Sequence, residues 1–508
     1  MNTFLQGLYS TNEFTRTENG AVARTSTGDD LLNLFAEGAA YRSRSEEDCV
    51  FLFKKAFEEN KEYALKCLFY IGDCRGGQGE RRFFRVCMRW LADNYPAVIK
   101  HLLVLIPEYR RWDDLFIFVG TNLELNALNF IKHQLALDVQ SETPSLLGKW
   151  MPSENTSSKK TRQLATRVRQ YLNMTSREYR KMLSVLRTRI NVLEKLMSEG
   201  RWDEIEFDKI PSKAGLKYKN AFAKHDIDRM KRDNTVQSYA DFAKDENTTV
   251  NAKTLYPYEV VAKAVKTLEI SSYYKKSVPL SDTGRLMVNK YWDNLEDYFN
   301  ERPFNGLAVV DTSSSMTWTR QKNAAVPLDV AISLGIYCAE HAKGPFAGHY
   351  MSFSSNPRLV KVEGVDFCDK VARIYHENLV ENTNIERCFD LMLNTALKNK
   401  CTQDEIPQNL IIISDMEFDS ATAIYNADET STLMESIEKR WNQAGYKMPK
   451  LIFWNVNARN DHYPMKVKDG VSFVSGMSPT IFEQIMTGKT AFDLMYEVLN
   501  SERYAAIN

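Results

Sequence analysis

Asp311, Ser313 and Ser315 place one carboxylate and two hydroxyls at alternate positions directly after the apolar residues 307–310. Asp415 closes a second apolar stretch, and Thr383 adds a hydroxyl in a polar loop between the two. Mg²⁺ prefers oxygen ligands and keeps several waters, so a small set of carboxylate and hydroxyl oxygens suits it as a partial cage. These five side chains therefore predict a site for Mg²⁺ or another divalent cation.

The elements that must position these ligands are alternating strands and helices after Pro303. Strands are expected at residues 306–311, 349–353, 359–362, 410–414, 451–456 and 471–474, and helices at 328–342, 385–397, 430–443 and 491–499. This alternation predicts a parallel sheet with helices on both faces, in a doubly wound, Rossmann-like arrangement. Ligands of such sheets gather outside the carboxyl ends of the strands, so Asp311 and Asp415 are expected to lie close together.

A helical pattern runs through residues 29–297 and predicts an α-solenoid of stacked helix pairs. In one predicted helix, Thr175 and Glu178 form a capping-box signature, and apolar residues recur at spacings of three and four from Tyr179 to Met197 before Gly200 ends the run. The expected fold class is therefore α followed by α/β. Its expected parts are a polar arm at residues 1–28, a helical-repeat domain at 29–302 and an α/β domain at 303–508.

Basic residues are concentrated between Lys149 and Met197, where 12 lysines and arginines stand against three acidic residues. Such clusters neutralise phosphates and release counterions, which is the usual electrostatic signature of nucleic-acid binding. The alternative is a solvated helical face whose long side chains cover apolar surface. The candidate RNA-binding residues are Lys149, Lys159, Lys160, Arg162, Arg167, Arg169, Arg177, Arg180 and Lys181.

The composition is that of a folded, soluble chain, because 44% of the 508 residues are hydrophobic and 26% are charged. The formal net charge is zero, but residues 1–300 carry +6 and residues 301–508 carry −6, so the halves are expected to have different partners. The eight cysteines form no C-x-x-C pair, which argues against a zinc knuckle or a disulfide framework. With no signal peptide and no membrane-spanning stretch visible, a cytoplasmic location without a membrane partner is expected.

The spacing of Asp311, Ser313, Ser315, Thr383 and Asp415 resembles the metal-ion-dependent adhesion site of von Willebrand factor A domains. A helical array followed by such a domain is similar to the Ro autoantigen proteins, whose TROVE module is a ring of HEAT-like helices closed by an A-like domain. Several segments resemble more closely an uncharacterised family that pairs a TROVE-like half with the same A domain. They are residues 17–21, 75–81, 111–114, 149–152 and 176–181.

The resemblance covers residues 17 to 503. It implies a TROVE-like, HEAT-like solenoid or ring for residues 29–302 and an A domain for residues 303–508. It also implies a monomeric, non-catalytic ring that binds small structured or misfolded RNA, with an A domain that closes the ring and binds the metal. The motif transfers only the metal ligands, so the basic cluster is nominated on its charge alone.

No catalytic residues are nominated. The glycine-rich residues 75–81 lack the G-K-[ST] ending of a phosphate-binding loop, and the chain has neither an H-E-x-x-H pair nor a G-x-S-x-G elbow. The leading hypothesis is an RNA-binding scaffold whose metal site would also hold an acidic residue of a protein partner. One alternative is a metal-dependent protein–protein interaction module without RNA. Another is a metal-dependent phosphoesterase, in which an ion at Asp311 and Asp415 polarises a phosphoryl oxygen.

Overall fold

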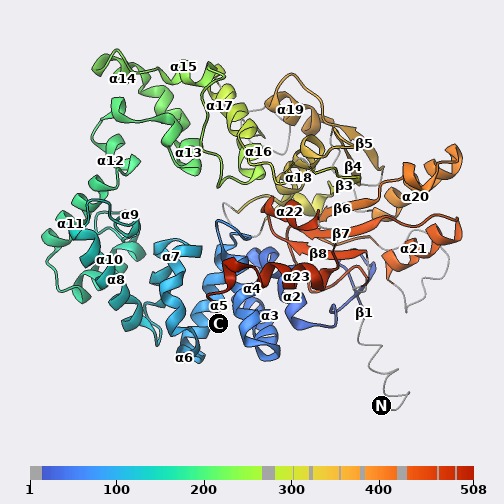
Figure 1. Ribbon diagram of the computed structural model, residues 1–508, viewed down its shortest axis with the longest axis horizontal. Coiled ribbons are helices and arrows are strands. Elements are labelled where there is room, and N and C mark those ends of the chain that lie inside the picture. Colours follow the sequence, from blue (N-terminus) through green and yellow to red (C-terminus); the bar gives the residue numbers. More distant parts are fainter. Residues whose placement is uncertain are drawn as a thin grey trace. The chain divides into compact units, whose positions relative to one another are not determined.

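The computed structural model describes residues 14–265, 281–300, 302–319, 324–353, 356–377, 384–419, 432–465, 468, 470–486 and 489–507 (Figure 1). The chain divides into two compact units. Unit 1 comprises the residues up to Ile71, Gly77–Phe83 and Ala252–Asn508, and unit 2 comprises Gly72–Gly76 and Phe84–Asn251. Residues 29–71 and 252–302, which the sequence assigns to the helical half, group with the sheet in this division. The reason is packing, because α2 (Asp30–Glu37) contacts the last strand and α16 (Pro257–Val265) contacts a helix that covers the sheet.

Unit 1 is built on a six-stranded sheet with the order β5-β4-β3-β6-β7-β8. The strands are β3 (Gly306–Asp311), β4 (His349–Phe353), β5 (Arg358–Lys361), β6 (Asn409–Ser414), β7 (Lys450–Asn455) and β8 (Val471–Ser475). Five of them are parallel, as expected, but β5 runs antiparallel to β4. The sheet is therefore mixed. Only four residues separate β4 from β5, and a parallel connection needs a crossover of a dozen or more residues.

Helices lie on both faces of this sheet. On one face, α18 (Pro327–His341) packs so closely that a Cβ at Gly335 would lie 2.6 Å from Val310 Cγ2. On the other face, α20 (Ile385–Asn399) places Cys388 Sγ 2.9 Å from Met351 Sδ. Met351 pairs with Val309, and successive strand residues point to opposite faces, so the two helices cover opposite sides. This two-sided cover accounts for the continuous burial of β3 and for its uninterrupted apolar sequence.

The remaining elements of unit 1 come from both ends of the chain. They are β1 (Phe14–Arg16), β2 (Val22–Arg24), η1 (Gly38–Ser43), α3 (Glu46–Glu59), α4 (Lys61–Gly72), α17 (Asp282–Asp293), η6 (Ser314–Thr317), α19 (Phe367–Glu377), η7 (Gln403–Glu405), α21 (Leu433–Gln443), α22 (Thr480–Ile485), α23 (Ala491–Leu499) and η8 (Glu502–Tyr504). Strands β1 and β2 form a separate antiparallel pair. The sequence did not predict β1, β2, α19 or α22.

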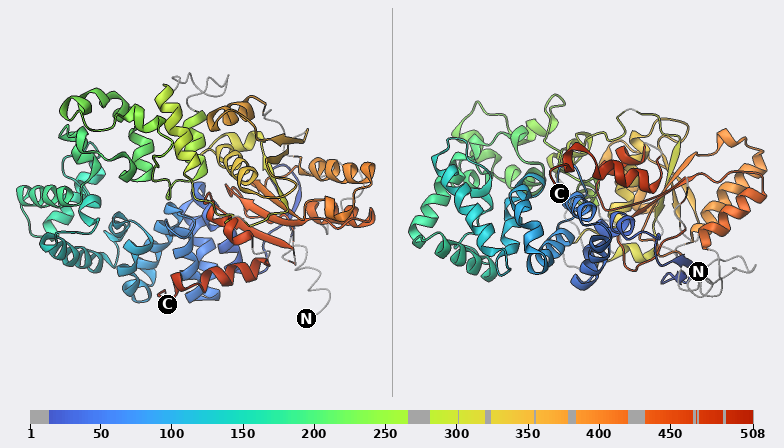
Figure 2. Two further views of the ribbon diagram at one scale, coloured as in Figure 1. Left: turned by 45° about the horizontal axis from the view of Figure 1, so that its top comes forward. Right: turned by 60° about the horizontal axis from the view of Figure 1, so that its bottom comes forward.

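Unit 2 is helical throughout its described residues. Its elements are α5 (Arg81–Asn94), α6 (Pro96–Ile99), η2 (Lys100–Leu105), α7 (Ile106–Tyr109), η3 (Trp112–Phe118), α8 (Glu124–Gln140), α9 (Leu147–Trp150), α10 (Lys159–Tyr171), α11 (Ser176–Arg189), α12 (Leu193–Ser198), η4 (Trp202–Glu204), η5 (Phe207–Lys209), α13 (Ser212–Lys224), α14 (Asp226–Arg232) and α15 (Tyr239–Lys244). Helices close in sequence contact one another, as α8 does α9 and α13 does α14. Figure 2 shows the helices following one another in chain order, which is consistent with the expected helical half.

The helix expected from Thr175 to Gly200 is divided in two. Its start is as expected, because Thr175 and Glu178 form the capping box at the start of α11. Its interior is not, since α11 ends at Arg189 and α12 begins at Leu193. Asn191 lies between them with a φ of 48°, a left-handed conformation that a helix interior excludes but asparagine tolerates. The expectation of one continuous helix was therefore wrong.

Within the described ranges, no helix is both long enough and apolar enough to span a bilayer.

Candidate functional sites

The adjacent strands β3 and β6 bring Asp311 and Asp415 to the same edge of the sheet. The two strands are parallel neighbours, with Val310 opposite Ile413. One residue further along, the Ser414 hydroxyl donates a hydrogen bond to Asp311 Oδ2 at 2.5 Å. Asp311 is thus hydrogen-bonded to Ser414, the residue directly before Asp415.

The loop after β3 holds the two expected hydroxyl ligands beside Asp311. The Ser313 backbone N–H donates to Asp311 Oδ1 at 2.9 Å, and the Ser313 and Ser315 Oγ atoms are 3.0 Å apart. Four of the five expected ligands therefore come from the same edge of the sheet. Thr383, the fifth, lies outside the described residues.

Both carboxylates are buried, and this raises their pKa values. Burial is the largest cause for Asp415, followed by the negative charge of Asp311, and together they raise its pKa to about 7 against the opposing charge of Arg459. Burial also raises the pKa of Asp311, against hydrogen bonds from Ser313 and Ser414 that favour the charged form. Two adjacent buried carboxylates that repel each other are a favourable environment for a cation.

Sequence reasoning missed two charged residues at this edge, Arg459 and Glu18. Arg459 follows β7, and its Nε lies 3.2 Å from Asp415 Oδ2, while its Nη1 lies 2.7 Å from Glu18 Oε2. An arginine shortly after the strand next to β6 was a visible signal. Nothing in the sequence pointed to Glu18, because it is 441 residues away from Arg459.

Glu18 belongs to an N-terminal segment, residues 17–20, that is bonded to the loop after β6. The Thr17 hydroxyl donates to the Phe418 carbonyl at 2.5 Å, and the Glu18 N–H donates to Glu417 Oε2 at 2.8 Å. The same Glu417 oxygen lies 3.1 Å from His462 Nε2. Burial alone would raise the pKa of Glu417, but the hydrogen bond and charge of His462 lower it below its usual value. The segment therefore fixes the loop that carries Asp415.

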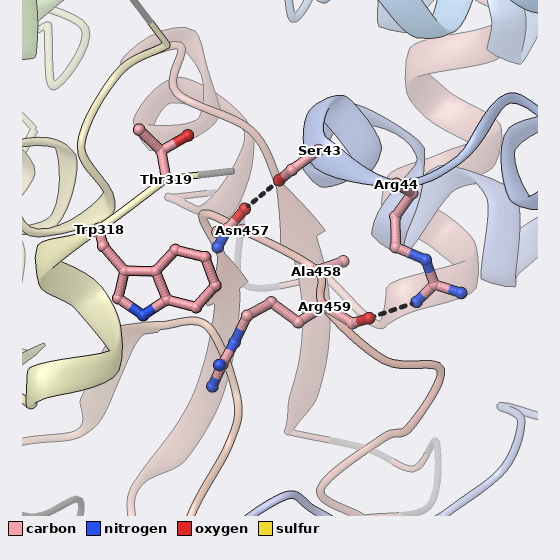
Figure 3. Close-up of a pocket in the computed structure, with 7 residues that line it drawn as sticks. All are labelled: Ser43, Arg44, Trp318, Thr319, Asn457, Ala458 and Arg459. Carbon is pink, nitrogen blue, oxygen red and sulfur yellow. Dashed lines mark hydrogen bonds between the residues drawn. The ribbon is translucent and has the colours of Figure 1, made fainter. Parts of the chain in front are cut away.

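A small pocket lies beside this edge, with an empty volume of about 260 Å³ that is partly open to solvent (Figure 3). It is lined by Ser43, Arg44, Trp318, Thr319, Asn457, Ala458 and Arg459. The Ser43 hydroxyl donates to Asn457 Oδ1 at 2.7 Å, and Arg44 Nη1 donates to the Arg459 carbonyl at 2.8 Å, as the dashed lines in Figure 3 show. Arg459 thus lines the pocket and also contacts Asp415, one of the two buried carboxylates.

The side chains at the strand ends fit a hard divalent cation. In the part of the chain that the structure describes, no group of three or more His, Cys, Asp or Glu residues is placed to hold a metal ion. The donors here are instead Asp311, Asp415, Ser313 and Ser315, a mixture of carboxylate and hydroxyl oxygens that suits Mg²⁺. Moreover, Asp415 Oδ2 is buried and has no hydrogen bond. A bound ion would supply positive charge to this oxygen and act as a Lewis acid toward an incoming oxygen ligand.

The nine expected RNA-binding residues lie on three helices of unit 2. Lys149 is on α9, the five residues from Lys159 to Arg169 are on α10, and the three from Arg177 to Lys181 are on α11. Glu154 joins the last two helices, because it accepts hydrogen bonds from Arg169 at the end of α10 and from Ser176 at the start of α11. The basic residues therefore share one helical hairpin and the short helix before it.

Five of these nine residues already have partners within unit 2. Arg167 pairs with Glu124 on α8, and its Nε lies 2.6 Å from Glu124 Oε1. Arg169 pairs with Glu154 at 2.8 Å. Of the other three, Arg162 donates to the Thr156 and Ser157 carbonyls, Arg180 donates to the Ser176 carbonyl, and the Lys149 ammonium lies 5.7 Å from the centre of the Trp150 ring.

The other four are Lys159, Lys160, Arg177 and Lys181. All four are exposed, and they make no ion pair or hydrogen bond through their side chains with any residue of the described structure. Two lie in the first turn of α10 and two in the first two turns of α11. Their charges are therefore available to an external anion.

Two family models match this chain. Residues 17–108 and 145–301 match a family described as "Domain of unknown function (DUF2828)", and residues 305–505 match one described as "Domain of unknown function (DUF7788)". The chain is also similar to "Uncharacterized protein L728" of Acanthamoeba polyphaga mimivirus. The two are 29% identical over 513 residues, which cover 93% of this chain and 84% of the viral protein. The observed helices followed by a mixed α/β sheet are consistent with an A-like domain in the C-terminal half.

Proposed function

We propose that this protein is a non-catalytic RNA-binding scaffold, in which the basic residues of α10 and α11 contact phosphate and the A-like domain binds a divalent cation. The observation that carries the proposal is the set of four exposed basic side chains without partners in the described structure: Lys159, Lys160, Arg177 and Lys181. A surface lysine or arginine that already has an acidic neighbour gains less from a phosphate, because its charge is partly neutralised. Only Arg167 and Arg169 have such an acidic neighbour, and the four unpaired residues also have no other side-chain contact to break, so they would supply a large share of the electrostatic attraction.

The test is charge reversal at these four positions, with RNA retention measured by filter binding over a range of salt concentrations. Each phosphate contact contributes about one to the slope of log affinity against log salt concentration, so the variant should lose most retention and flatten the slope by about three to four. The matched control reverses four exposed lysines on η2, α13, α14 and α15: Lys100, Lys224, Lys231 and Lys244. It changes net charge equally and should keep most of the retention. Equal losses in the two variants, or none in either, would refute RNA binding at α10 and α11.

Arg167 and Arg169 are unsuitable for this test, although they belong to the same basic cluster. Their carboxylate partners, Glu124 and Glu154, would face a like charge after reversal. A loss of RNA retention could then come from damage to the helical hairpin instead of loss of phosphate contacts. Restricting the reversal to the unpaired residues avoids this ambiguity.

The second candidate function is a metal-dependent protein interaction module without RNA. It is favoured by the buried Asp415 oxygen that lacks a hydrogen bond and by the hydroxyl ligands beside Asp311. Neutral hydroxyl ligands leave a bound ion electrophilic, so it would attract a carboxylate of an acidic partner. An immobilised acidic peptide should then be retained by the wild-type protein in Mg²⁺, released by a chelator, and not retained by Asp311→Ala. If the peptide is retained equally well in the presence of a chelator and by Asp311→Ala, this function is excluded.

A further inference from the structure

We infer that Arg459, held between Glu18 and Asp415, sets the affinity of the strand-end site for a divalent cation. This inference rests on the metal-binding part of the proposed function and is independent of RNA. Arg459 bridges two carboxylates, because its Nε lies 3.2 Å from Asp415 Oδ2 and its Nη1 lies 2.7 Å from Glu18 Oε2. Only 9% of its side chain is exposed, so solvent screens its charge weakly.

Arg459 and Asp415 form an ion pair but no hydrogen bond. The Arg459 Nε and Asp415 Oδ2 atoms are both buried, and neither makes a hydrogen bond. The guanidinium therefore stabilises the Asp415 carboxylate through its charge and leaves the lone pairs of that oxygen unused. Asp415 Oδ1 accepts a hydrogen bond from the Glu417 N–H at 3.3 Å, so Oδ2 is the oxygen of this carboxylate that remains for an ion. Arg459 therefore acts as an internal cation that competes with the metal for Asp415.

Glu18 acts in the opposite direction. Its side chain is 41% exposed, and its carboxylate contacts Nη1 of Arg459, whereas Asp415 contacts Nε, so Glu18 offsets the charge of Arg459 through a different atom. The backbone of Glu18 is fixed at the same place by its bond to Glu417, and Asn460 donates to Glu18 Oε1 at 3.1 Å. The N-terminal segment thus holds an anion against Arg459 and weakens its competition with the metal.

These opposing charges predict opposite changes in metal affinity. Repulsion between a guanidinium and a divalent ion that share one carboxylate corresponds to about tenfold in a binding constant even at the dielectric of bulk water. Arg459→Gln should therefore bind Mn²⁺ at least about tenfold more tightly than the wild type. Glu18→Gln should bind it more weakly, by about threefold, because an exposed charge is better screened. Arg459→Lys keeps the charge and should stay within about threefold of the wild type.

The experiment is a calorimetric titration of the full-length protein with Mn²⁺ alone, supported by melting curves with and without the ion. Asp311→Ala serves as the variant without a site. The matched control is Arg440→Gln, because Arg440 also bridges two acids, Glu386 and Asp390, and lies on α21. It should leave Mn²⁺ affinity within about twofold of the wild type. Without metal, Arg459→Gln should melt at a lower temperature than the wild type, and Mn²⁺ should restore most of the difference.

The outcomes distinguish a failure of this inference from a failure of the proposal that the strand-end site binds a divalent cation. Tighter Mn²⁺ binding by Arg459→Gln, or binding by that variant alone, supports the inference. If the wild type binds Mn²⁺ and Arg459→Gln binds it equally or less tightly, the inference is wrong and the metal site stands. If none of the variants binds Mn²⁺ at millimolar concentration, both are wrong. Glu18→Gln provides a second test with little risk to folding, and an unchanged or increased affinity in that variant also contradicts the inference.

Discussion

Replacing Gly335 with alanine should destabilise unit 1, although alanine is the better helix former. Gly335 lies inside α18, where a Cβ would be 2.6 Å from Val310 Cγ2 and 3.6 Å from the Tyr350 ring. Non-bonded carbon atoms pack best at about 3.5–4.0 Å, so the helix and the strand must separate by about 1 Å. Val310 directly precedes Asp311, and this strain therefore acts at the candidate metal site.

The magnitude follows from two opposing contributions. Overpacking of a close-packed core costs about 1–3 kcal/mol. A glycine-to-alanine change in a helix interior contributes about 1 kcal/mol in the opposite direction. The expected net loss is about 1–2 kcal/mol. Val310→Ala alone should cost about 2 kcal/mol for its two buried methyl groups and the cavity they leave, and the double variant should lose less than the sum because the new methyl occupies that cavity.

Hydrogen exchange measured by mass spectrometry reports this unit directly. Amides of β3 and β6 should exchange about 5- to 30-fold faster in Gly335→Ala, which corresponds to the expected loss of stability. Peptides from α10 and α11 of unit 2 provide the internal control and should not change. Unchanged or slower exchange in β3, or a double variant that loses the full sum of the single losses, would refute the packing argument.

Three further predictions concern capping, pH and metal. Thr175→Ala removes the capping box of α11 and should cost about 1 kcal/mol of stability. The loss should appear as faster hydrogen exchange in the first turn of that helix, and Ser184→Ala, at an exposed position of the same helix, should leave this exchange unchanged. Burial, followed by the charge of Asp461, raises the pKa of Glu37 to about 8. Its contribution to stability is therefore complete below the ordinary value of 4.5 and is lost as pH rises through about 8. Melting curves from pH 5 to 8.5 should show a decline that Glu37→Gln makes smaller, because the raised pKa of Asp415 contributes to the same decline. A decline of equal size in both proteins would contradict the assignment. Adding Mg²⁺ at ten times its dissociation constant should stabilise unit 1 by about 1.4 kcal/mol, and Asp311→Ala should not respond.

The strands next to the candidate site were predictable because both faces of the sheet are covered. Burial on two sides makes each central strand a continuous apolar run, and a polar residue marks its end. The expected bounds of β3 and β4 are those that the structure shows, and β6 begins one residue earlier than expected. The direction of β5 could also have been inferred from its short connection. A signal for α19 was present in the spacing of Phe367, Val371 and Ile374.

What the sequence could not supply were contacts between distant segments. Strands β1 and β2 have three residues each, too few for a recognisable alternation. The charge surplus between Lys149 and Met197 was visible, but Glu124 pairs with Arg167 from outside that window. Counting charges along the chain therefore overestimated how many of them are free. The break at Asn191 was hidden for another reason, because its apolar neighbours keep the helical spacing across it.

The bond between Thr17 and Phe418 has a consequence for how the protein is made. The two residues are 401 positions apart, and at about 5–20 residues per second the first would wait about 20–80 seconds for the second to leave the ribosome. Unit 2 lies almost entirely in residues 84–251 and can form during that wait. The apolar side of α2, with Leu32 and Phe35, has no finished sheet to pack against until β8 is synthesised. Incomplete chains that lack β8 would therefore expose the apolar side of α2 to solvent. We expect chaperones to bind the nascent chain most strongly before β8 has been synthesised.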